Sequence, residues 1–357
     1  MLYFIPTKVY CEKDCVRKHG KELSSYGEKA MIVTGASSSK VNGSLRDVQT
    51  VLTKENISYI VFDEIEENPS IETVMKARDI GVKEEVDFII GVGGGSPMDA
   101  AKAIALMVKN PTETGKILYE TKPLSYLPVV CVPTTCGTGS EVTPYAILTV
   151  HEHRMKKGMT HRIFPELALL DWTYLRCMSR EGLISTAVDA LAHLIESYLN
   201  VNANQWNRTF SREGLAVWAQ FKEGLKNAQL LEEDYEKMLR ASTLAGMAIA
   251  HTGTSLPHGL SYTLTYELGI PHGRAAGLYL AGFVARYQNK EDTDAVLDLL
   301  GFEDSIKFQE YMRVLLGHTE VDEWILRMGA QNILADARKM KNYPFAITEQ
   351  EMLDMFQ

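Results

Sequence analysis

The sequence has 357 residues, more than one ordinary hydrophobic core organises, so two domains are expected. Apolar residues make up 45% and charged residues 23%, the balance of a soluble globular protein. The formal net charge of −9 disfavours a general nucleic-acid-binding role, because duplex binding usually requires a basic face.

The beginning of the chain predicts no secretory leader. Residues 1–6 are apolar, but Lys8, Glu12 and Lys13 follow at once, and neither a basic leader nor a cleavage signal is present. No apolar run approaches the roughly 20 residues that span a bilayer. Five cysteines form an odd, sparse set, which argues against a disulfide framework. We therefore expect a cytoplasmic protein without membrane or nucleic-acid partners.

Short β-rich runs alternate with helical patterns in the first half of the chain. Strands are predicted at residues 30–34, 57–62, 86–92, 127–132, 145–150 and 167–170. Helical spacing occupies residues 70–81 and 97–109. This alternation predicts an open, mainly parallel α/β sheet.

The pattern changes after Met178, where long helical segments rich in Leu, Ala and Met follow without strand alternation. A Thr-x-x-Glu capping box, Thr348 to Glu351, opens the last predicted helix. We predict an α/β domain over residues 1–178 and an all-α domain over residues 179–357. No linker separates them, so we expect them to pack closely and share a cleft.

A glycine-rich segment, residues 91–99, joins a predicted strand to a predicted helix. Ser96 suits the N-cap, Pro97 the first helical position and Asp99 position N3. Glycine N–H groups together with a helix N-terminus form a pyrophosphate site, although a tight turn that only lets strand and helix pack is the alternative. The segment is neither the Gly-x-Gly-x-x-Gly fingerprint nor a P-loop. We expect Asp99 to cap the helix or to accept hydrogen bonds from ribose or nicotinamide.

A second loop, Pro-Thr-Thr-Cys-Gly-Thr-Gly-Ser-Glu at residues 133–141, follows another predicted strand. Its hydroxyl groups suit the other side of a nucleotide, and an ordinary flexible turn is the alternative. Two such loops at strand ends fit ligand binding along the carboxyl edge of a parallel sheet.

Four residues form a candidate metal site. Asp189 and His193 are four apart on a predicted helix, which places their β-carbons about 5–6 Å apart on one face. Such a pair is more often only hydrogen-bonded, but His258 and His272 each lie in a Pro-His-Gly triplet that predicts a rigid turn or helix start. One carboxylate and three imidazoles suit a first-row divalent ion and leave a position open, as in catalytic sites. Glu196 is a further ligand, an outer partner or a surface residue.

These motifs together resemble the iron-containing, or group III, alcohol dehydrogenases over essentially the whole chain. The resemblance rests on the loops at 93–99 and 133–141, the Asp-Ala-x-x-His helix and the spacing of the two later histidines. It implies a dehydroquinate synthase-like architecture, with a nucleotide-binding α/β domain, a helical domain, and metal and nicotinamide meeting in the cleft. It also implies homo-oligomers, most often homodimers.

The resemblance implies roles for the two loops. The diphosphate and nicotinamide side of the coenzyme would contact Gly94, Gly95, Ser96 and Asp99. The adenosine and ribose portions would contact Thr134, Thr135 and Thr138, and a lysine of the pair 156–157, taken as Lys157, would reach a ribose.

The chain departs from the family pattern at three positions. Many members have a histidine near the nicotinamide where this chain has Tyr262, which we expect to help relay a proton. Many NAD-preferring members have an aspartate after the second strand, where Gly35 stands here. Cys136 replaces a small residue, and its thiol is a candidate oxidation liability.

The absence of that aspartate bears on coenzyme choice. Without a carboxylate at Gly35 a 2′-phosphate is not repelled, and Ser37, Ser39 and Lys40 offer donors. We predict NADP(H) in preference to NAD(H).

The sequence therefore predicts a metal-dependent, NAD(P)-linked alcohol dehydrogenase or aldehyde reductase that acts on small primary alcohols or diols. We expect Fe(II), with Zn(II) as the alternative, because the ligand set does not choose between them. A glycerol-type polyol dehydrogenase is the nearest alternative function. A dehydroquinate synthase-like lyase is more distant, since only Arg274 lies near the metal ligands in the sequence.

Overall fold

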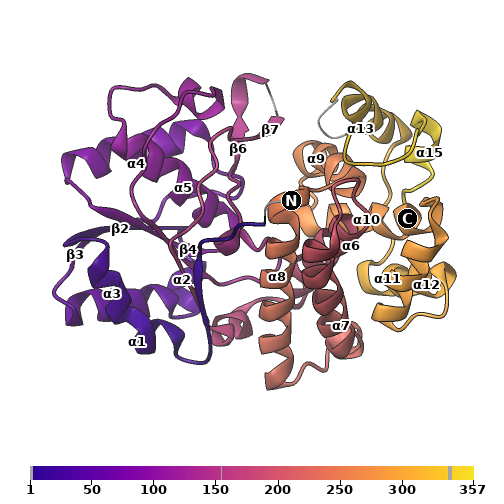
Figure 1. The fold of residues 1–357 in the computed structure, drawn as a ribbon, viewed down its shortest axis with the longest axis horizontal. Helices are drawn as coiled ribbons and strands as arrows, with labels where there is room; N and C mark the ends of the chain where they lie inside the picture. The colour runs from indigo at the N-terminus through magenta and orange to yellow at the C-terminus, as the bar shows by residue number, and fades with distance from the viewer. Residues whose placement is uncertain (1–2, 154, 337–339) are drawn as a thin grey trace. The chain divides into compact units, whose positions relative to one another are not determined.

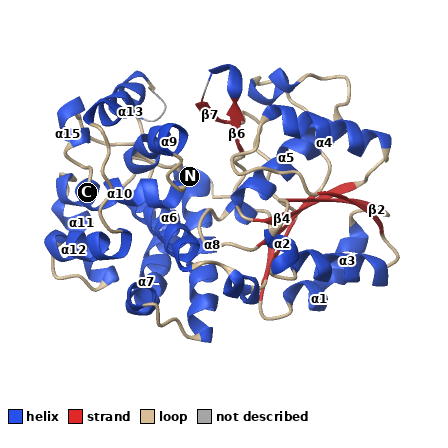
Figure 2. Cartoon of the chain, turned by 180° about the vertical axis from the view of Figure 1, so that it is seen from behind, coloured by secondary structure: helices blue, strands red, loops and turns tan. Residues whose placement is uncertain are grey.

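The computed structural model describes residues 3–153, 155–336 and 340–357. The chain divides into two compact units, an α/β unit that runs to Thr135 and resumes over Gly139–Met178, and a helical unit of Cys136–Thr138 with Ser179–Gln357. Figures 1 and 2 show that strands occur in the first unit and long helices fill the second. This confirms the predicted fold class.

The α/β unit is built on a parallel sheet of six strands in the order β1-β8-β5-β4-β2-β3. Its strands are β1 (Lys8–Cys11), β2 (Lys29–Thr34), β3 (Ser58–Phe62), β4 (Phe88–Gly93), β5 (Val129–Pro133) and β8 (Leu167–Leu170). Its helices are α1 (Cys15–His19), α2 (Ser38–Val41), α3 (Ser44–Lys54), α4 (Ile71–Lys83) and α5 (Gly95–Lys109). Short 3₁₀ turns are η1 (Gly20–Ser25), η2 (Gly115–Tyr119), η3 (Ser140–Val142), η4 (His151–His153) and η5 (Trp172–Cys177).

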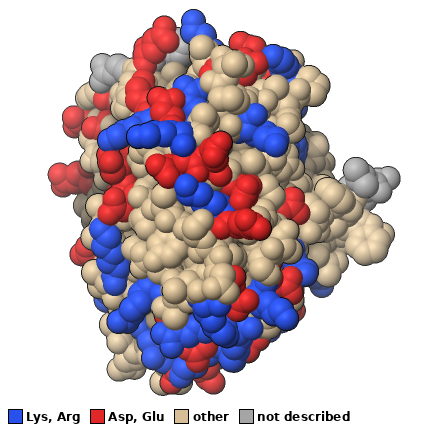
Figure 3. All heavy atoms as spheres, turned by 90° about the vertical axis from the view of Figure 1, so that its left-hand side faces the viewer, with Lys and Arg blue, Asp and Glu red and all other residues tan. Residues whose placement is uncertain are grey.

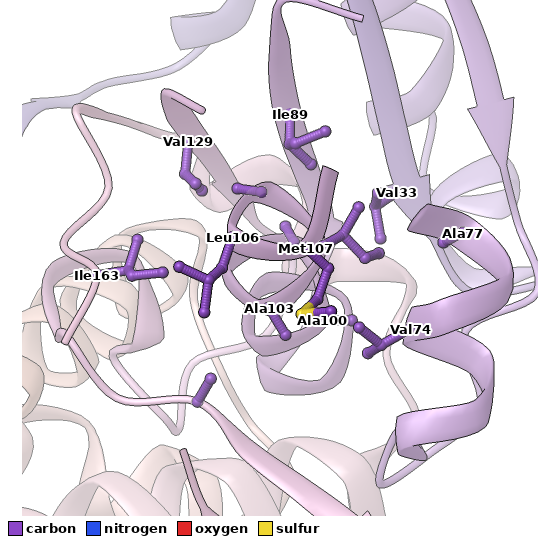
Figure 4. Packing of buried hydrophobic residues seen from close by; sticks show 14 of the residues in the cluster. Val33, Val74, Ala77, Ile89, Ala100, Ala103, Leu106, Met107, Val129 and Ile163 are labelled. Atoms are coloured by element: carbon purple, nitrogen blue, oxygen red, sulfur yellow. The ribbon is translucent and has the colours of Figure 1, made fainter. Parts of the chain in front are cut away.

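Helices cover both faces of the sheet, and successive side chains of a strand point toward opposite faces. On β2, Met31 and Val33 enter the core beneath α4 and α5, whereas Ala30 and Ile32 enter the core beneath α1 and α3. Figure 4 shows the first of these cores, where Ala100 and other residues of α5 pack close to the sheet.

The strand predicted at residues 145–150 forms β6 (Ile147–Val150), but it is not part of the main sheet. It pairs antiparallel with β7 (Met155–Gly158), to which η4 connects it. The missing place in the sheet is taken by β1, an edge strand of only four residues, none of which is fully buried.

The helical unit contains α6 (Arg180–Tyr198), α7 (Gln205–Asn227), α8 (Glu232–Thr252), α9 (Leu256–Leu268), α10 (His272–Arg286), α11 (Lys290–Leu300), α12 (Ser305–Leu316), α13 (Glu323–Ala335) and α15 (Glu349–Leu353). Helix α6 is buried over most of its length and packs against α7, α8 and α10. The indole N–H of Trp218 on α7 donates to the carbonyl of Ala187 on α6 at 2.8 Å. The predicted capping box of Thr348 and Glu351 is present at the start of α15.

Surface charges of both signs are interspersed on the face drawn in Figure 3. Ion pairs of the α/β unit include Lys76 with Glu64 at 2.5 Å and Arg17 with Asp47 at 2.7 Å. Among the described helices, none combines the length and the apolar character needed to cross a bilayer.

Candidate functional site

Both Pro-His-Gly segments place their histidine in the first turn of a helix, which confirms the sequence-based prediction. Pro257 lies in the first turn of α9, directly before His258. Pro271 is the N-cap of α10, whose first residue is His272. Proline at a helix start fixes the local backbone, so each imidazole projects from a rigid main chain.

Asp189 on α6 faces these two histidines. Its Oδ1 lies 3.3 Å from Nε2 of His258 and 3.8 Å from Nε2 of His272. Ligand atoms of the three residues all lie within 4.8 Å of one another. Among the described residues, neither Oδ1 of Asp189 nor Nε2 of His258 has a hydrogen-bond partner, although both are buried. Because unpaired buried polar atoms are costly, this group fits a divalent cation that would satisfy them.

His193 lies one helical turn after Asp189 and beside the converging group. Its ring stacks on that of His258 with the centroids 4.2 Å apart. Its Nδ1 lies 3.2 Å from the carbonyl oxygen of Gly137. Donation from Nδ1 to this carbonyl leaves Nε2 as the nitrogen able to bind a cation. His193 is outside the group whose ligand atoms converge within 4.8 Å, so its coordination stays a prediction.

The electrostatics of the group favour cation binding. Burial alone raises the pKa of Asp189, but the three histidines outweigh it and hold that pKa well below its usual range. Burial and the neighbouring His258 lower the pKa of His193 to about 4. Burial also opposes charge on His258, yet Glu196 and Asp189 raise its pKa to about 10. Asp189 is therefore ionised and His193 neutral, the forms in which these side chains bind metal ions, whereas the protonated His258 releases a proton when a cation binds at its Nε2.

Glu196 proves to be a buried residue whose carboxylate accepts a hydrogen bond from Nδ1 of His258. It is not among the converging ligand atoms. Of the alternatives open from the sequence, the structure thus supports the outer partner.

Tyr262 follows His258 by one turn of α9 and is half-buried. Its ring stacks on that of His272, with centroids 5.6 Å apart and planes inclined by 20°. The phenol therefore lies against the most exposed of the converging ligands, whose side chain is 29% exposed. Its role as a proton relay stays a prediction.

The glycine-rich segment, residues 91–99, includes the end of β4 and the first residues of α5. The helix begins at Gly95 with Gly94 as N-cap, so the prediction that Ser96 caps it is wrong. Glycine lets the chain enter the helix earlier, and the Ser96 hydroxyl instead accepts a hydrogen bond from the Asn68 N–H at 3.1 Å. Gly93 has φ +149°, and a β-carbon there would lie 2.7 Å from the following proline ring. This turn therefore requires glycine.

The threonine loop lies next to the glycine-rich segment, because β4 and β5 are parallel neighbours. The N–H of Thr134 donates to the carbonyl of Gly93 at 2.8 Å. A β-carbon on Gly94 would lie 3.2 Å from the Thr135 side chain. Thr138 groups instead with the helical unit, as part of Cys136–Thr138. The first two threonines thus border the half-buried start of α5, where backbone N–H groups favour an anion.

Asp99 and Lys102 hold this arrangement together, and sequence reasoning missed Lys102. Asp99 accepts hydrogen bonds from the Ser140 hydroxyl at 2.5 Å and the Ile147 N–H at 2.8 Å. Lys102 is fully buried and donates to the carbonyls of Ser140 and Tyr145, each at 2.8 Å, and to the Ser140 hydroxyl at 2.7 Å. The predicted role of Asp99 as a helix cap is wrong because α5 begins four residues earlier. Its contact with the coenzyme stays a prediction.

The loop after β2 presents only part of the predicted set of donors. Ser37 and Lys40 are exposed, whereas the hydroxyl of Ser39 is buried and accepts a hydrogen bond from Thr34 at 2.7 Å. Asp63, which directly follows β3, forms an ion pair with Lys40 at 2.6 Å. Sequence reasoning missed this carboxylate, because it comes from a neighbouring strand rather than from the loop itself.

Two remaining candidates have ordinary surroundings in the structure. Lys157 lies on β7 with Nζ 4.6 Å from the centroid of the Tyr119 ring. Cys136 is buried, with Sγ 3.2 Å from the Thr186 hydroxyl, and burial raises the pKa of its thiol to about 12. Because the thiolate is the reactive form, the expectation that Cys136 is an oxidation liability is not supported.

Family models match the two halves of the chain. The model described as iron-containing alcohol dehydrogenase matches residues 6–172, and that of the C-terminal part of the Fe-containing alcohol dehydrogenase family matches residues 183–352. The solved structure of an iron-containing alcohol dehydrogenase from Thermotoga maritima is 39% identical, with a TM-score of 0.91 over 99% of this chain and 98% of that one. This chain belongs to the iron-containing alcohol dehydrogenase family.

Curated relatives in this family differ in length. Aldehyde-alcohol dehydrogenase 2 of Entamoeba histolytica is 32% identical over 80% of this chain, which spans only 34% of that protein. The NADPH-dependent butanol dehydrogenase of Clostridium saccharobutylicum is 29% identical over 81% of this chain and 74% of its own length. The chain thus spans about a third of the first relative and about three quarters of the second.

Proposed function

We propose that this member of the family is a metal-dependent, NAD(P)-linked alcohol dehydrogenase or aldehyde reductase for small primary alcohols or diols. The metal ligands are Asp189, His193, His258 and His272. The observation that supports this site is the pair of buried, unpartnered atoms, Oδ1 of Asp189 and Nε2 of His258, which face each other beside His272. The helical part is the metal-binding and substrate-binding domain, and residues 1–178 are the nucleotide-binding domain.

The ion, Fe(II) in this proposal, supplies Lewis acidity toward an alcohol or carbonyl oxygen when bound. Asp189 contributes the negative charge of the ligand set, while the helix starts hold His258 and His272 in place. The ring of Tyr262 stacks on that of His272, and in this proposal its hydroxyl group relays a proton to or from solvent. The nicotinamide coenzyme supplies or accepts the hydride.

The coenzyme in this proposal lies along the two loops of the α/β unit. Gly94, Gly95 and Ser96 receive the diphosphate at the start of α5, where the backbone N–H groups of a helix N-terminus favour an anion. Thr134 and Thr135 border the same place. The proposed preference for NADP(H) rests on Gly35 and on the exposed donors Ser37 and Lys40. A cytoplasmic homodimer completes the proposal.

The substrate class is supported by the family and by the butanol dehydrogenase among the relatives. The lyase alternative gains no support, because its sugar-phosphate acid substrate would need several Lys and Arg residues around the metal, and in the sequence only Arg274 lies near the ligands. A glycerol-type polyol remains a substrate to include in the test.

The test is anaerobic reconstitution with Fe(II) or Zn(II), followed by NADPH and NADH oxidation across aldehydes of increasing length and hydroxyaldehydes. We expect turnover with Fe(II) and simple aldehydes, and loss of turnover in Asp189→Asn. Inactivity of the reconstituted protein with both metals and both coenzymes would reject the dehydrogenase. Turnover confined to the hydroxyaldehydes would select the glycerol-type alternative.

A further inference from the structure

Glu196 is a fully buried carboxylate that no part of the proposed chemistry uses. It lies on α6 three residues after His193, and its side chain is 0% exposed. Burying a carboxylate is costly unless hydrogen bonds and opposite charge compensate for the lost hydration. The compensation must therefore come from its immediate surroundings.

Among the described residues, the Glu196 carboxylate accepts three hydrogen bonds, all from one short segment at the start of α9. The donors are the N–H of Ser255, the N–H of His258 at 3.2 Å, and Nδ1 of His258. Ser255 is the N-cap of α9 but makes no capping hydrogen bond with its own side chain. The carboxylate of Glu196 therefore supplies the acceptor and the negative charge that a helix N-terminus favours.

The contact with Nδ1 has a second consequence. An imidazole that donates from Nδ1 to a carboxylate has its ring orientation fixed and its other nitrogen made a better donor of electrons. In His258 that other nitrogen is Nε2, the buried atom 3.3 Å from Oδ1 of Asp189. Glu196 thus contacts Nδ1 of the His258 ring, and Nε2 of the same ring points to the candidate metal site.

We propose that Glu196 is a positioning residue for the metal site. It fixes His258 with Nε2 toward Asp189 and strengthens this imidazole as a ligand, while also capping α9. The inference rests on the proposed function, because it requires that His258 bind the ion.

The decisive comparison is between Glu196→Gln and Asp234→Asn. Asp234 is a matched control, since it is also a buried carboxylate that accepts a backbone N–H, from Leu231, at the start of a long helix of the same unit. Both changes remove a charge without changing side-chain size. Only the first removes the carboxylate that contacts a candidate ligand.

The readouts are the dissociation constants for Co(II) and Zn(II), by competition with a chelator, the visible spectrum of the Co(II) protein, and the thermal unfolding of the metal-free protein. We expect Glu196→Gln to raise the dissociation constants for both metals by about 10- to 100-fold and to change the Co(II) spectrum. Asp234→Asn should lower only the unfolding temperature. An unchanged Co(II) spectrum and affinity in Glu196→Gln would overturn the inference and leave Glu196 a helix cap.

Two further proteins keep the result interpretable. If Glu196→Gln does not fold, Glu196→Asp retains the charge near α9 but withdraws it from Nδ1, and weaker binding with a changed spectrum is again expected. Wild-type affinity in Glu196→Asp would then overturn the inference. Failure of the wild-type protein itself to bind Co(II), with no difference from Asp189→Asn, would reject the proposed metal site and the inference with it.

Discussion

Gly273 approaches Ser185 so closely that a β-carbon on the glycine would lie 1.9 Å from the serine carbonyl oxygen and 2.7 Å from Cβ of Asp189. Only a residue without a side chain lets α10 meet α6 at this point. Gly273 directly follows His272. The close contact of α10 with α6 therefore also sets the distance of 3.8 Å between Nε2 of His272 and Oδ1 of Asp189.

We therefore expect Gly273→Ala to damage metal binding and stability together. The methyl group must displace α10 from α6, at a cost of about 1–3 kcal/mol or more, as for overpacked cores. Displacement also separates His272 from Asp189, so the affinity for Co(II) should fall at least tenfold. Chelator competition and urea unfolding of the metal-free protein measure the two effects.

Gly329→Ala is the control for this change. Gly329 lies within α13 of the same unit, and a β-carbon there would meet the Thr263 side chain at an ordinary 3.4 Å. Alanine also favours helix over glycine by up to about 1 kcal/mol. The control should keep both stability and affinity. If Gly273→Ala behaves like Gly329→Ala, the close approach does not position His272.

Lys102 provides a second prediction, on the stability of the α/β unit. Lys102→Met fills a similar volume but removes the donor to Ser140 and Tyr145 and leaves Asp99 without its cation 3.7 Å away. Removing one partner of a buried charged pair typically costs about 3–5 kcal/mol. We expect the free energy of unfolding in urea to fall by about the lower of these values. NADPH binding should also weaken, because the loops around Asp99 lose the hydrogen bonds that Lys102 donates.

The exposed Lys76 serves as the comparison for Lys102. Its partner Glu64 is more than half exposed, as Lys76 is itself, so Lys76→Met should cost less than about 1 kcal/mol. Equal losses in the two variants would show that burial of Lys102 adds nothing to its ion pair and hydrogen bonds.

The sequence predicts this fold well where the signal is local. Buried strands such as β4 are continuous apolar runs, and Pro257 and Pro271 mark the helix starts that present the histidines. Strand β1 escapes prediction because it has only four residues, too few to show the alternation of a strand. Residues 145–150 have the composition of a strand, but composition does not specify the partner, so β6 was expected in the main sheet and pairs with β7 instead.

The candidate site shows the same division. Asp189 and His193 follow from helical spacing, whereas the roles of Glu196 and Asp63 depend on partners 62 and 23 positions away in the sequence. No periodic pattern encodes such long-range pairs. Ser39 illustrates the converse, since a serine that reads as an exposed donor lies with its hydroxyl against Thr34 in the core.

Tyr262→Phe tests the proton relay. Phenylalanine keeps the ring that stacks on His272 at 5.6 Å, so structure and metal affinity should not change. General acid–base groups typically contribute about 100-fold or more to the rate. We expect kcat for aldehyde reduction to fall by about 10- to 100-fold, with an altered pH profile. A kcat that equals the wild-type value at every pH would remove Tyr262 from the mechanism.

The ion pair of Lys40 and Asp63 gives the last prediction, which concerns coenzyme choice. In the proposed function Lys40 is a donor to a 2′-phosphate, but Asp63 already holds its ammonium at 2.6 Å and brings negative charge to the same place. Both side chains are about half exposed, so each charge acts through screened interactions of roughly 1 kcal/mol or less, which correspond to a severalfold change in affinity. Asp63→Asn should therefore tighten NADPH binding about threefold to fivefold and leave NADH nearly unchanged. Lys40→Gln should weaken NADPH binding by a similar factor, and both effects should shrink at high salt.

Fluorescence titrations with each coenzyme measure these dissociation constants. Glu64→Gln is the control, because it removes the adjacent acidic charge, which pairs with Lys76 instead of Lys40. Equal effects of Lys40→Gln on the two coenzymes, or tighter binding of NADH by the wild-type protein, would contradict the assignment of the loop after β2 to a 2′-phosphate.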